Sequence, residues 1–466
     1  MKKSMMRSIL LFAGISFLFS FCQSKKSIEE VNESAEMIKL MTLDPGHFHA
    51  ALVQKEMLDN VDSTVYVFAP EGKDVEQHLN RIKGFNSRKA DPTSWNEDIY
   101  IGPDYFEKML KDQPGNVMVV SGNNAIKADY ILKTINLGIN VLADKPMVIS
   151  PDEFSQLEEA FKLAEKNDVL LYDIMTERYE ITTILQKELS QIQEIFGVLL
   201  PGSAEQPSIT KESIHHFFKY VSGNPLIRPA WFFDVEQQGE GIVDVTTHLV
   251  DLVQWECFPE QVIDYKNDIE IISAKRWTTD LSLKQFKKVT GLNAYPDYLV
   301  KDVEGDVLKV FSNGEITYKI KDVVAKVSVI WNYQAPEGTG DTHYSIMRGT
   351  NSDLVINQGK EEGYRPVLYI EAKGDTTSFN DKISKVINVD LQQKYPGIEI
   401  MKAGDNLWKI KIPDLFKEGH EAHFSQVTEK FLEYLENKNM PSWEVPNMLA
   451  KYYTTTEALK LAETEK

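Results

Sequence analysis

One short stretch of the sequence combines residue types that could take a proton from a hydroxyl group. After the glycine-containing turn Gln238–Gly241, the chain carries Asp244, His248 and Asp251 at helical spacing. On a helix, this spacing places the three side chains on one face. An imidazole has a pKa near working pH, so His248 could act as a general base with Asp244 one turn away to orient it. A lone histidine on such a helix would more often be a packed core residue, but three polar residues on one face favour a general-base site.

A second stretch, residues 44–49, follows an apolar run at residues 38–43, where a dinucleotide-binding fold places its glycine-rich turn. Against the pattern G-x-G-x-x-G, Asp44 replaces the first glycine and His49 the third. Gly46 keeps the second, which lets the backbone approach a pyrophosphate. The pyrophosphate would then lie on the amides of Gly46, His47 and Phe48. The altered turn leaves two interpretations open, a nucleotide site and a purely structural turn.

The elements that must position these residues change character near residue 174. Before it, short apolar strands alternate with amphipathic helices, which predicts a parallel sheet with helices on both faces. The predicted strands are residues 38–43, 64–69, 116–121, 140–143 and 169–173, and the predicted helices are residues 50–58, 125–137 and 151–166, the last with Ser150 as N-cap. Residues 71–95 form a polar insertion, predicted to be a helix plus a loop.

After residue 174 the pattern changes to longer strands, several of them alternating in polarity, and then to helices. These strands are residues 308–310, 316–320, 324–331, 344–347, 353–358 and 367–371, and the helices are residues 381–395, 421–437 and 445–463. The fold class predicted from the two patterns is α/β. Residues 37–174 would form a Rossmann-type, doubly wound parallel sheet that binds a dinucleotide. Residues 175–466 would form an α/β domain with a large, mostly antiparallel open sheet.

Two sequence blocks resemble motifs of the glucose–fructose oxidoreductase / inositol dehydrogenase (Gfo/Idh/MocA) family. The first runs from Gly138 to Pro146 and ends in Asp-Lys-Pro where the family has Glu-Lys-Pro, and the second is the stretch from Gln238 to Asp251. Arg178 after the last parallel strand, and the loop from Arg228 to Asp234, resemble two further family segments. The resemblance extends from residue 37 to about residue 442. It implies NAD(H) or NADP(H) as cofactor and the oxidation or reduction of sugars and cyclitols.

The resemblance also implies roles for individual residues. Lys145 would polarise the reacting oxygen, His248 would move its proton, and Asp244 would orient the imidazole. The implied cofactor contacts are Gly46, His47, Phe48, Ser121, Asn123, Asp144 and Lys145. The implied substrate contacts are Arg178, Arg228, Trp231, Asp244 and His248. His215 and His216 either line the same site or lie on a helix surface. The expected partners are a small sugar or glycoside and further copies of the chain, and no metal site is expected.

Three functions remain open at this point. The first is a nicotinamide-dependent oxidoreductase that transfers hydride from a hydroxyl of a sugar, glycoside or polyol. The second is an NAD-dependent glycoside hydrolase that oxidises its substrate transiently, eliminates the aglycone and re-reduces the sugar. The third is a non-catalytic carbohydrate-binding lipoprotein that has lost its cofactor. Asp44 and His49 favour the third function, whereas Lys145, Asp244 and His248 oppose it.

The N-terminal residues are typical of an exported protein. A basic start with Lys2, Lys3 and Arg7 precedes an apolar run at residues 9–21, which predicts a signal peptide at residues 1–22. Cys22 follows this run as in a bacterial lipobox, although phenylalanines replace the usual leucine and small residue. We expect lipidation of Cys22, a linker at residues 23–36 and a periplasmic or outer-membrane-anchored lipoprotein. A plain cleaved signal is the alternative.

Charge and cysteine content exclude some classes of function. The formal net charge is −19, which repels polyanions and argues against a nucleic-acid partner. Apart from Cys22 the chain has one cysteine, Cys257, so no intramolecular disulfide is expected in the mature protein.

Overall fold

The computed structural model describes residues 37–221 and 224–464. The predictions for the signal peptide, Cys22 and the linker lie outside the described residues. Within the described part of the chain, no helix has the length and apolar character needed to cross a membrane.

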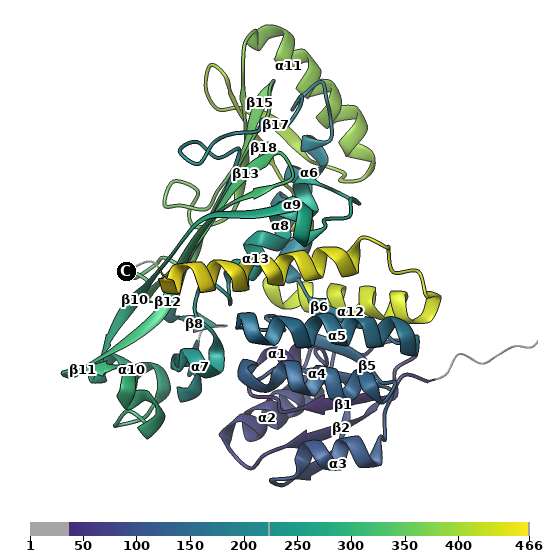
Figure 1. Cartoon of the computed structure of the whole chain (residues 1–466). Helices are drawn as coiled ribbons and strands as arrows, with labels where there is room; N and C mark the ends of the chain where they lie inside the picture. Colours follow the sequence, from purple (N-terminus) through teal and green to yellow (C-terminus); the bar gives the residue numbers. More distant parts are fainter. Residues whose placement is uncertain (1–36, 222–223, 465–466) are drawn as a thin grey trace, which may run out of the picture. The chain divides into compact units, whose positions relative to one another are not determined.

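The first sheet is the predicted parallel, Rossmann-type sheet (Figure 1). Its six strands lie in the order β3-β2-β1-β4-β5-β6, and every neighbouring pair is parallel. They are β1 (Leu40–Leu43), β2 (Thr64–Ala69), β3 (Asn96–Ile101), β4 (Val117–Val120), β5 (Asn140–Asp144) and β6 (Leu171–Ile174). Every residue of β1, β4 and β6 is buried, as expected for strands covered by helices on both faces.

The helices of this part are α1 (His49–Leu52), α2 (Lys73–Ser87), α3 (Tyr105–Asp112), α4 (Lys127–Asn136) and α5 (Pro151–Asn167). Ser150 caps α5 in a capping box with Glu153, as predicted. The helix expected at residues 50–58 was wrong, because only the single turn α1 forms there. The polar insertion is a helix, α2, followed by a loop, as predicted, and it leads into the edge strand β3, which the sequence did not indicate.

The second sheet is large, open and mostly antiparallel, as predicted. Its order is β10-β12-β13-β7-β14-β15-β16-β18-β17, β11 pairs with β12, and only the β13–β7 pair is parallel. The strands are β7 (Ile209–Phe218), β10 (Ile269–Ser282), β11 (Val303–Glu304), β12 (Val307–Ile320), β13 (Val323–Gln334), β14 (Thr342–Arg348), β15 (Ser352–Asn357), β16 (Val367–Ala372), β17 (Glu399–Lys402) and β18 (Leu407–Lys411). A separate hairpin pairs β8 (Tyr220–Val221) with β9 (Asn224–Pro225).

The helices after residue 174 lie on one face of this sheet or, like α12, against the first sheet (Figure 1). They are α6 (Ile181–Ser190), α7 (Val235–Gln238), α8 (Thr246–Cys257), α9 (Tyr265–Asp268), α10 (Leu283–Thr290), α11 (Thr376–Lys385), α12 (His420–Asn437) and α13 (Glu444–Thr464). α12 shares the hydrophobic core of the first sheet through Phe424, Val427 and Phe431. α13 contacts α5, α8 and β10, so it packs against elements of both sheets.

A buried ionic network fixes α8 between the first sheet and α13. Arg178, which follows β6, donates to both oxygens of Asp251 on α8 at 2.7 Å and to Glu444 on α13 at 3.0 and 3.1 Å. Lys451 on α13 pairs with Asp251 at 3.0 Å and with Asp173 of β6 at 2.6 Å. Burial opposes ionisation of Asp251, but the charges of Arg178 and Lys451 outweigh it and hold its pKa below the ordinary value.

Candidate active site

A cavity of about 730 Å³ lies at the carboxyl edge of the first sheet and is also lined by residues of the second sheet and of α12. Its wall is rich in groups that titrate or carry charge. The histidines are His47, His49, His215, His248, His343 and His420, and the carboxylates are Asp144, Glu177, Asp244, Asp341 and Glu421. The cations are Lys55, Lys145, Lys219 and Arg228.

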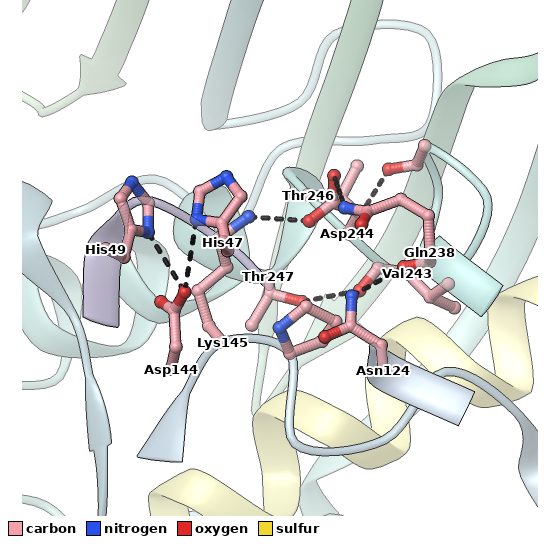
Figure 2. A network of polar contacts seen from close by, with 12 residues as sticks. His47, His49, Asn124, Asp144, Lys145, Gln238, Val243, Asp244, Thr246 and Thr247 are labelled. Carbon is pink, nitrogen blue, oxygen red and sulfur yellow. Dashed lines mark hydrogen bonds and ion pairs between the residues drawn. The ribbon is translucent and has the colours of Figure 1, made fainter. Parts of the chain in front are cut away.

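Lys145 and Asp244 meet in this cavity as a close ion pair. Lys145 directly follows β5, and its Nζ donates to Asp244 Oδ1 at 2.6 Å (Figure 2). The other oxygen of Asp244 accepts from Gln238 Nε2 at 3.1 Å. Gly241 brings this turn against the second sheet, since a Cβ there would overlap the carbonyl oxygen of Ser312. The turn thus places the carboxylate of Asp244 next to the ammonium group of Lys145 at the end of β5.

His248 lies on the first turns of α8 and lines the same cavity. Its Nδ1 has no hydrogen-bond partner among the described residues. Burial, followed by the charge of Lys145, lowers its pKa well below the ordinary value, so the imidazole is neutral and is a weaker base than the pKa near working pH expected from the sequence would make it.

The predicted pairing of Asp244 with the imidazole is not present. Because α8 begins only at Thr246, Asp244 lies in the turn before the helix and contacts Lys145 instead. Asp251, the third polar residue of the predicted face, belongs to the buried network with Arg178. Asp244 therefore reaches the cavity from a turn, whereas Asp251 helps to fix α8 in the core.

Two histidines and one aspartate form a second polar cluster in the cavity wall. His49 Nδ1 lies 3.0 Å from Asp144 Oδ2, and His47 Nδ1 lies 3.6 Å from the same oxygen (Figure 2). Ser121 Oγ donates to this oxygen at 2.7 Å. Burial alone would raise the pKa of Asp144, but the neighbouring His49 and His47 hold it well below the ordinary value, so the group is a carboxylate.

The predicted pyrophosphate turn is filled by another side chain. A Cβ built on Gly46 would lie 3.2 Å from Trp231 Cζ2, so the indole occupies the space above the glycine. Trp231 is held there by a hydrogen bond from its Nε1 to Asp74 Oδ2 at 2.9 Å. Asp44, in the left-handed region with φ 46°, adds a second carboxyl group, whose pKa is raised to about 6 by burial and by Asp74.

The surroundings of this turn do not favour a pyrophosphate either. α1 is a single turn and therefore offers little helix dipole. At its start His49 packs against Phe424, with ring centroids 4.4 Å apart. Asn123 donates to Gln237 Oε1 at 2.9 Å and Asn124 to the carbonyl oxygen of Gln238 at 2.7 Å, so α7 covers the neighbouring loop. In this arrangement the turn does not fit the pyrophosphate of a dinucleotide.

The structure divides the residues predicted to contact cofactor and substrate. Those that line the cavity are His47, Phe48, Asp144, Lys145, Arg228, Asp244 and His248. Those that do not line it are Gly46, Ser121, Asn123, Arg178 and Trp231. Arg228 is largely engaged by protein groups, because Nε donates to the carbonyl oxygen of Phe217 at 2.9 Å and the guanidinium lies 4.5 Å from the Phe232 ring centroid.

Other cavity residues gave little or no signal in the sequence. Asp341 accepts from Lys219 at 2.6 Å and faces His216 Nδ1 at 2.9 Å and His215 Nδ1 at 3.5 Å. His215 and His216 lie on the strand β7 and not on a helix surface. His420 comes from the start of α12, far along the chain. These groups meet because the distant strands β7 and β14 pair and because α12 packs against the first sheet, and no local pattern of residues reveals either contact.

Comparison with known proteins gives two family matches and several similar structures. The family described as "Oxidoreductase family, NAD-binding Rossmann fold" matches residues 48–173, and "Putative oxidoreductase C terminal domain" matches residues 185–463. No curated protein matches the sequence.

Among solved structures, a "putative oxidoreductase" from Parabacteroides merdae is 57% identical, with 93% of this chain and 99% of that chain covered and a TM-score of 0.91. A "putative oxidoreductase" from Thermotoga maritima is 12% identical, with 92% and 99% covered and a TM-score of 0.59. A levoglucosan dehydrogenase in complex with NADH is also 12% identical, with 92% and 98% covered and a TM-score of 0.58. The last two similarities establish the fold alone.

Proposed function

Because this chain belongs to the Gfo/Idh/MocA family of oxidoreductases, we propose that it acts on a hydroxyl group of a sugar, glycoside or polyol bound in the cavity. Two proteins of similar fold support this class of substrate. One is the levoglucosan dehydrogenase, which is also known in complex with NADH and levoglucosan, and the other is a 3-ketoreductase from Actinomadura kijaniata in complex with NADP and TDP-benzene.

The observation that carries the proposal is the arrangement of Lys145, Asp244 and His248 in one cavity wall. The lysine and the histidine come from different parts of the fold, the end of β5 and the start of α8, yet both line the same space. A cation placed at the reacting oxygen stabilises negative charge that develops there in the transition state. A neutral imidazole beside it accepts the hydroxyl proton.

Asp244 acts in this scheme on the lysine and not on the histidine. Its contact with Lys145 Nζ at 2.6 Å holds the ammonium group in place, and its second oxygen is held by Gln238. A substrate oxygen that approaches Lys145 therefore meets a cation whose position is already fixed, and no reorganisation is needed at the moment of reaction.

The identity of the hydride acceptor is inferred from the family relationship and not from the geometry of this chain. The family implies NAD or NADP, but Trp231 would have to leave the turn at Gly46 before a pyrophosphate could lie there. The redox-neutral hydrolase is less favoured for the same reason, because it needs a dinucleotide that stays bound throughout the cycle.

The filled turn favours a second candidate function, a carbohydrate-binding protein that no longer uses a dinucleotide. Such a protein would bind sugars in the same cavity without converting them. The two candidates differ in one measurable property, turnover. For both candidates we further propose an exported protein that is anchored by a lipid on Cys22, so that its ligands are extracellular or periplasmic glycans and their fragments.

The test is a product assay on the purified mature protein. A panel of glycosides and polyols is incubated with and without NAD⁺ and NADP⁺, and products are identified by NMR, while native mass spectrometry detects any dinucleotide retained on purification. Lys145→Met should lower kcat at least about 100-fold, as expected when a transition-state charge loses its partner.

Lys55→Met is the matched control, because Lys55 also lines the cavity but pairs with Glu421 at 2.9 Å, away from Asp244. Its kcat should stay within a few-fold of the unmodified value. Near-normal turnover by Lys145→Met would refute the assignment. Sugar binding without any turnover by the unmodified chain would favour the second candidate.

A further inference from the structure

We propose that His47, His49 and Asp144 bind a divalent transition-metal ion. One ligand atom from each side chain can be chosen so that all three atoms lie within 4.8 Å of one another. Residues 37–221 and 224–464 contain one group of this kind. Neither the family relationship nor the proton-transfer site accounts for it.

The fold brings the three side chains together from two strand ends. β1 leads into the turn that carries His47 and His49, and β5 ends at Asp144, with β4 between the two strands. The carboxyl ends of parallel strands meet at one edge of the sheet, which places all three groups at the cavity wall. The two imidazole rings stand edge to face, with centroids 4.0 Å apart, and both Nδ1 atoms lie near Asp144 Oδ2.

The distances match those of ligands around one ion. Zinc binds imidazole nitrogen and carboxylate oxygen at about 2.0–2.2 Å, so two ligands at tetrahedral or octahedral angles are about 3.0–3.5 Å apart. The observed separations are 3.0 Å between His49 Nδ1 and Asp144 Oδ2 and 3.6 Å between His47 Nδ1 and the same oxygen. Small shifts of the two rings would complete the geometry.

Hydrogen bonding alone does not satisfy the cluster. At 3.6 Å, His47 Nδ1 is too far from Asp144 Oδ2 for a hydrogen bond, and this buried nitrogen has no partner in the described part of the chain. Asp144 Oδ2 is already approached by Ser121 and His49. A cation between the nitrogens and the oxygen would give His47 Nδ1 the partner that it lacks, while His49 and Asp144 would exchange a hydrogen bond for a shared ion.

Hydrogen bonds from neighbouring side chains hold Asp144 in place, as outer contacts hold the ligands of metal sites. Ser121 Oγ donates to the carboxylate, and the buried Lys127 Nζ donates to the main-chain oxygen of Asp144 at 2.8 Å and to Asn124 Oδ1 at 2.6 Å. Such outer contacts fix the orientation of ligands. The donor set of two imidazoles and one carboxylate suits Zn²⁺, Fe²⁺, Co²⁺ or Ni²⁺ and not Mg²⁺ or Ca²⁺, which prefer oxygen ligands throughout.

Three protein ligands leave coordination positions open, and all three residues line the cavity that also contains Lys145. If the proposed function holds, a hydroxyl oxygen of the substrate can occupy an open position close to the proton-transfer site. Binding of the ion itself does not depend on that function. It is therefore measured without substrate.

The experiment uses the purified protein after treatment with a chelator. Zn²⁺ is titrated by calorimetry, and Co²⁺ is titrated while its visible absorption is recorded. We expect one ion per chain, with cobalt bands typical of nitrogen and oxygen ligands. His47→Gln and Asp144→Asn should each weaken binding by more than the roughly 10–100-fold that loss of an outer contact costs. Circular dichroism and the melting temperature show whether each variant is folded.

His215→Gln is the matched control, because His215 is also a cavity histidine that faces an aspartate, Asp341. It should bind the ion as the unmodified chain does. Absence of stoichiometric binding would overturn the proposal, and so would binding that His47→Gln leaves unchanged. Loss of binding in His215→Gln alone would place the ion at Asp341 and overturn it as well. A chain that binds the ion but converts no sugar would refute only the proposed function.

Discussion

Replacement of Asp44 by asparagine should stabilise the protein at neutral pH, in a way that depends on pH. Asp44 lies at the end of β1 with φ 46°, and its pKa is raised from 3.8 to about 6 by burial and by the carboxylate of Asp74. Its side chain accepts no hydrogen bond in the part of the chain that the structure describes. Asparagine has the same shape and tolerates the left-handed backbone, so the substitution removes the charge and little else.

The size of the effect follows from the pKa shift. A rise from 3.8 to about 6 corresponds to about 3 kcal/mol at about 1.4 kcal/mol per pKa unit. The Asp44 side chain is only partly buried by its solvent exposure, and screening by solvent reduces this to about 2 kcal/mol. Between pH 4 and pH 6 the native carboxyl group retains a proton that the unfolded chain has lost. The stability of the unmodified protein therefore falls, relative to the variant, as pH rises through this window. Near pH 4 the two proteins should be about equally stable.

The assay is urea unfolding of both proteins across this pH range, with the difference in free energy of unfolding plotted against pH. Asp91→Asn is the control, because Asp91 is an exposed aspartate with nearly the same backbone conformation, φ 47°. That variant should show no pH-dependent difference. The reasoning would be refuted if Asp44→Asn were destabilising at pH 7, or if its effect were the same at pH 4 and pH 7.

Three further predictions concern Arg178, Trp231 and Cys22. Arg178→Leu should destabilise the protein by about 3–5 kcal/mol, because Asp251 and Glu444 would lose their shared buried cation, and a variant with unchanged urea stability would contradict a structural role. Trp231→Ala should bind NAD or NADP at least about tenfold more tightly in calorimetry, since the turn would be opened, and equal or weaker binding would show that the indole is not what blocks it. Cys22→Ser should move the protein from the membrane fraction to a soluble or uncleaved form, whereas unchanged fractionation and mobility would indicate an ordinary signal peptide.

The parallel sheet could be predicted because its central strands are buried on both faces. Such strands appear in the sequence as short, continuous apolar runs, and the runs at residues 116–121 and 140–143 overlap β4 and β5 closely. The start of α5 was equally clear, because Ser150 and Pro151 are a cap and a first-turn residue in their own right. In these places local chemistry and tertiary structure agree.

The sequence does not indicate elements that are mostly exposed, or elements whose ends are set by tertiary packing. β3 has a polar sequence and is mostly exposed at the sheet edge, so its pairing with β2 left no apolar signal. β7 and β10 lie in the large sheet, and their burial alternates only irregularly along each strand, so the sequence does not indicate them. In the candidate site, the spacing of Asp244 and His248 predicts one helix, but the turn at Gly241 packs against β12 and α8 begins only at Thr246. Asp244 therefore lies outside the helix and pairs with Lys145 instead of an imidazole.

The departures from the dinucleotide fingerprint gain a common explanation if the turn after β1 has acquired a different ligand. His49 stands where the pattern has its third glycine, and in the structure it faces Asp144, the residue that replaces the family's glutamate. Asp44 and Trp231 make the same turn unfavourable for phosphates by charge and by volume. Loss of one ligand and gain of another at a single sheet edge would leave the proposed proton-transfer groups in place. Lys145 is held by Asp244, and His248 is held by the packing of α8. Metal binding by a chain that binds dinucleotides poorly is the combined result that this explanation requires.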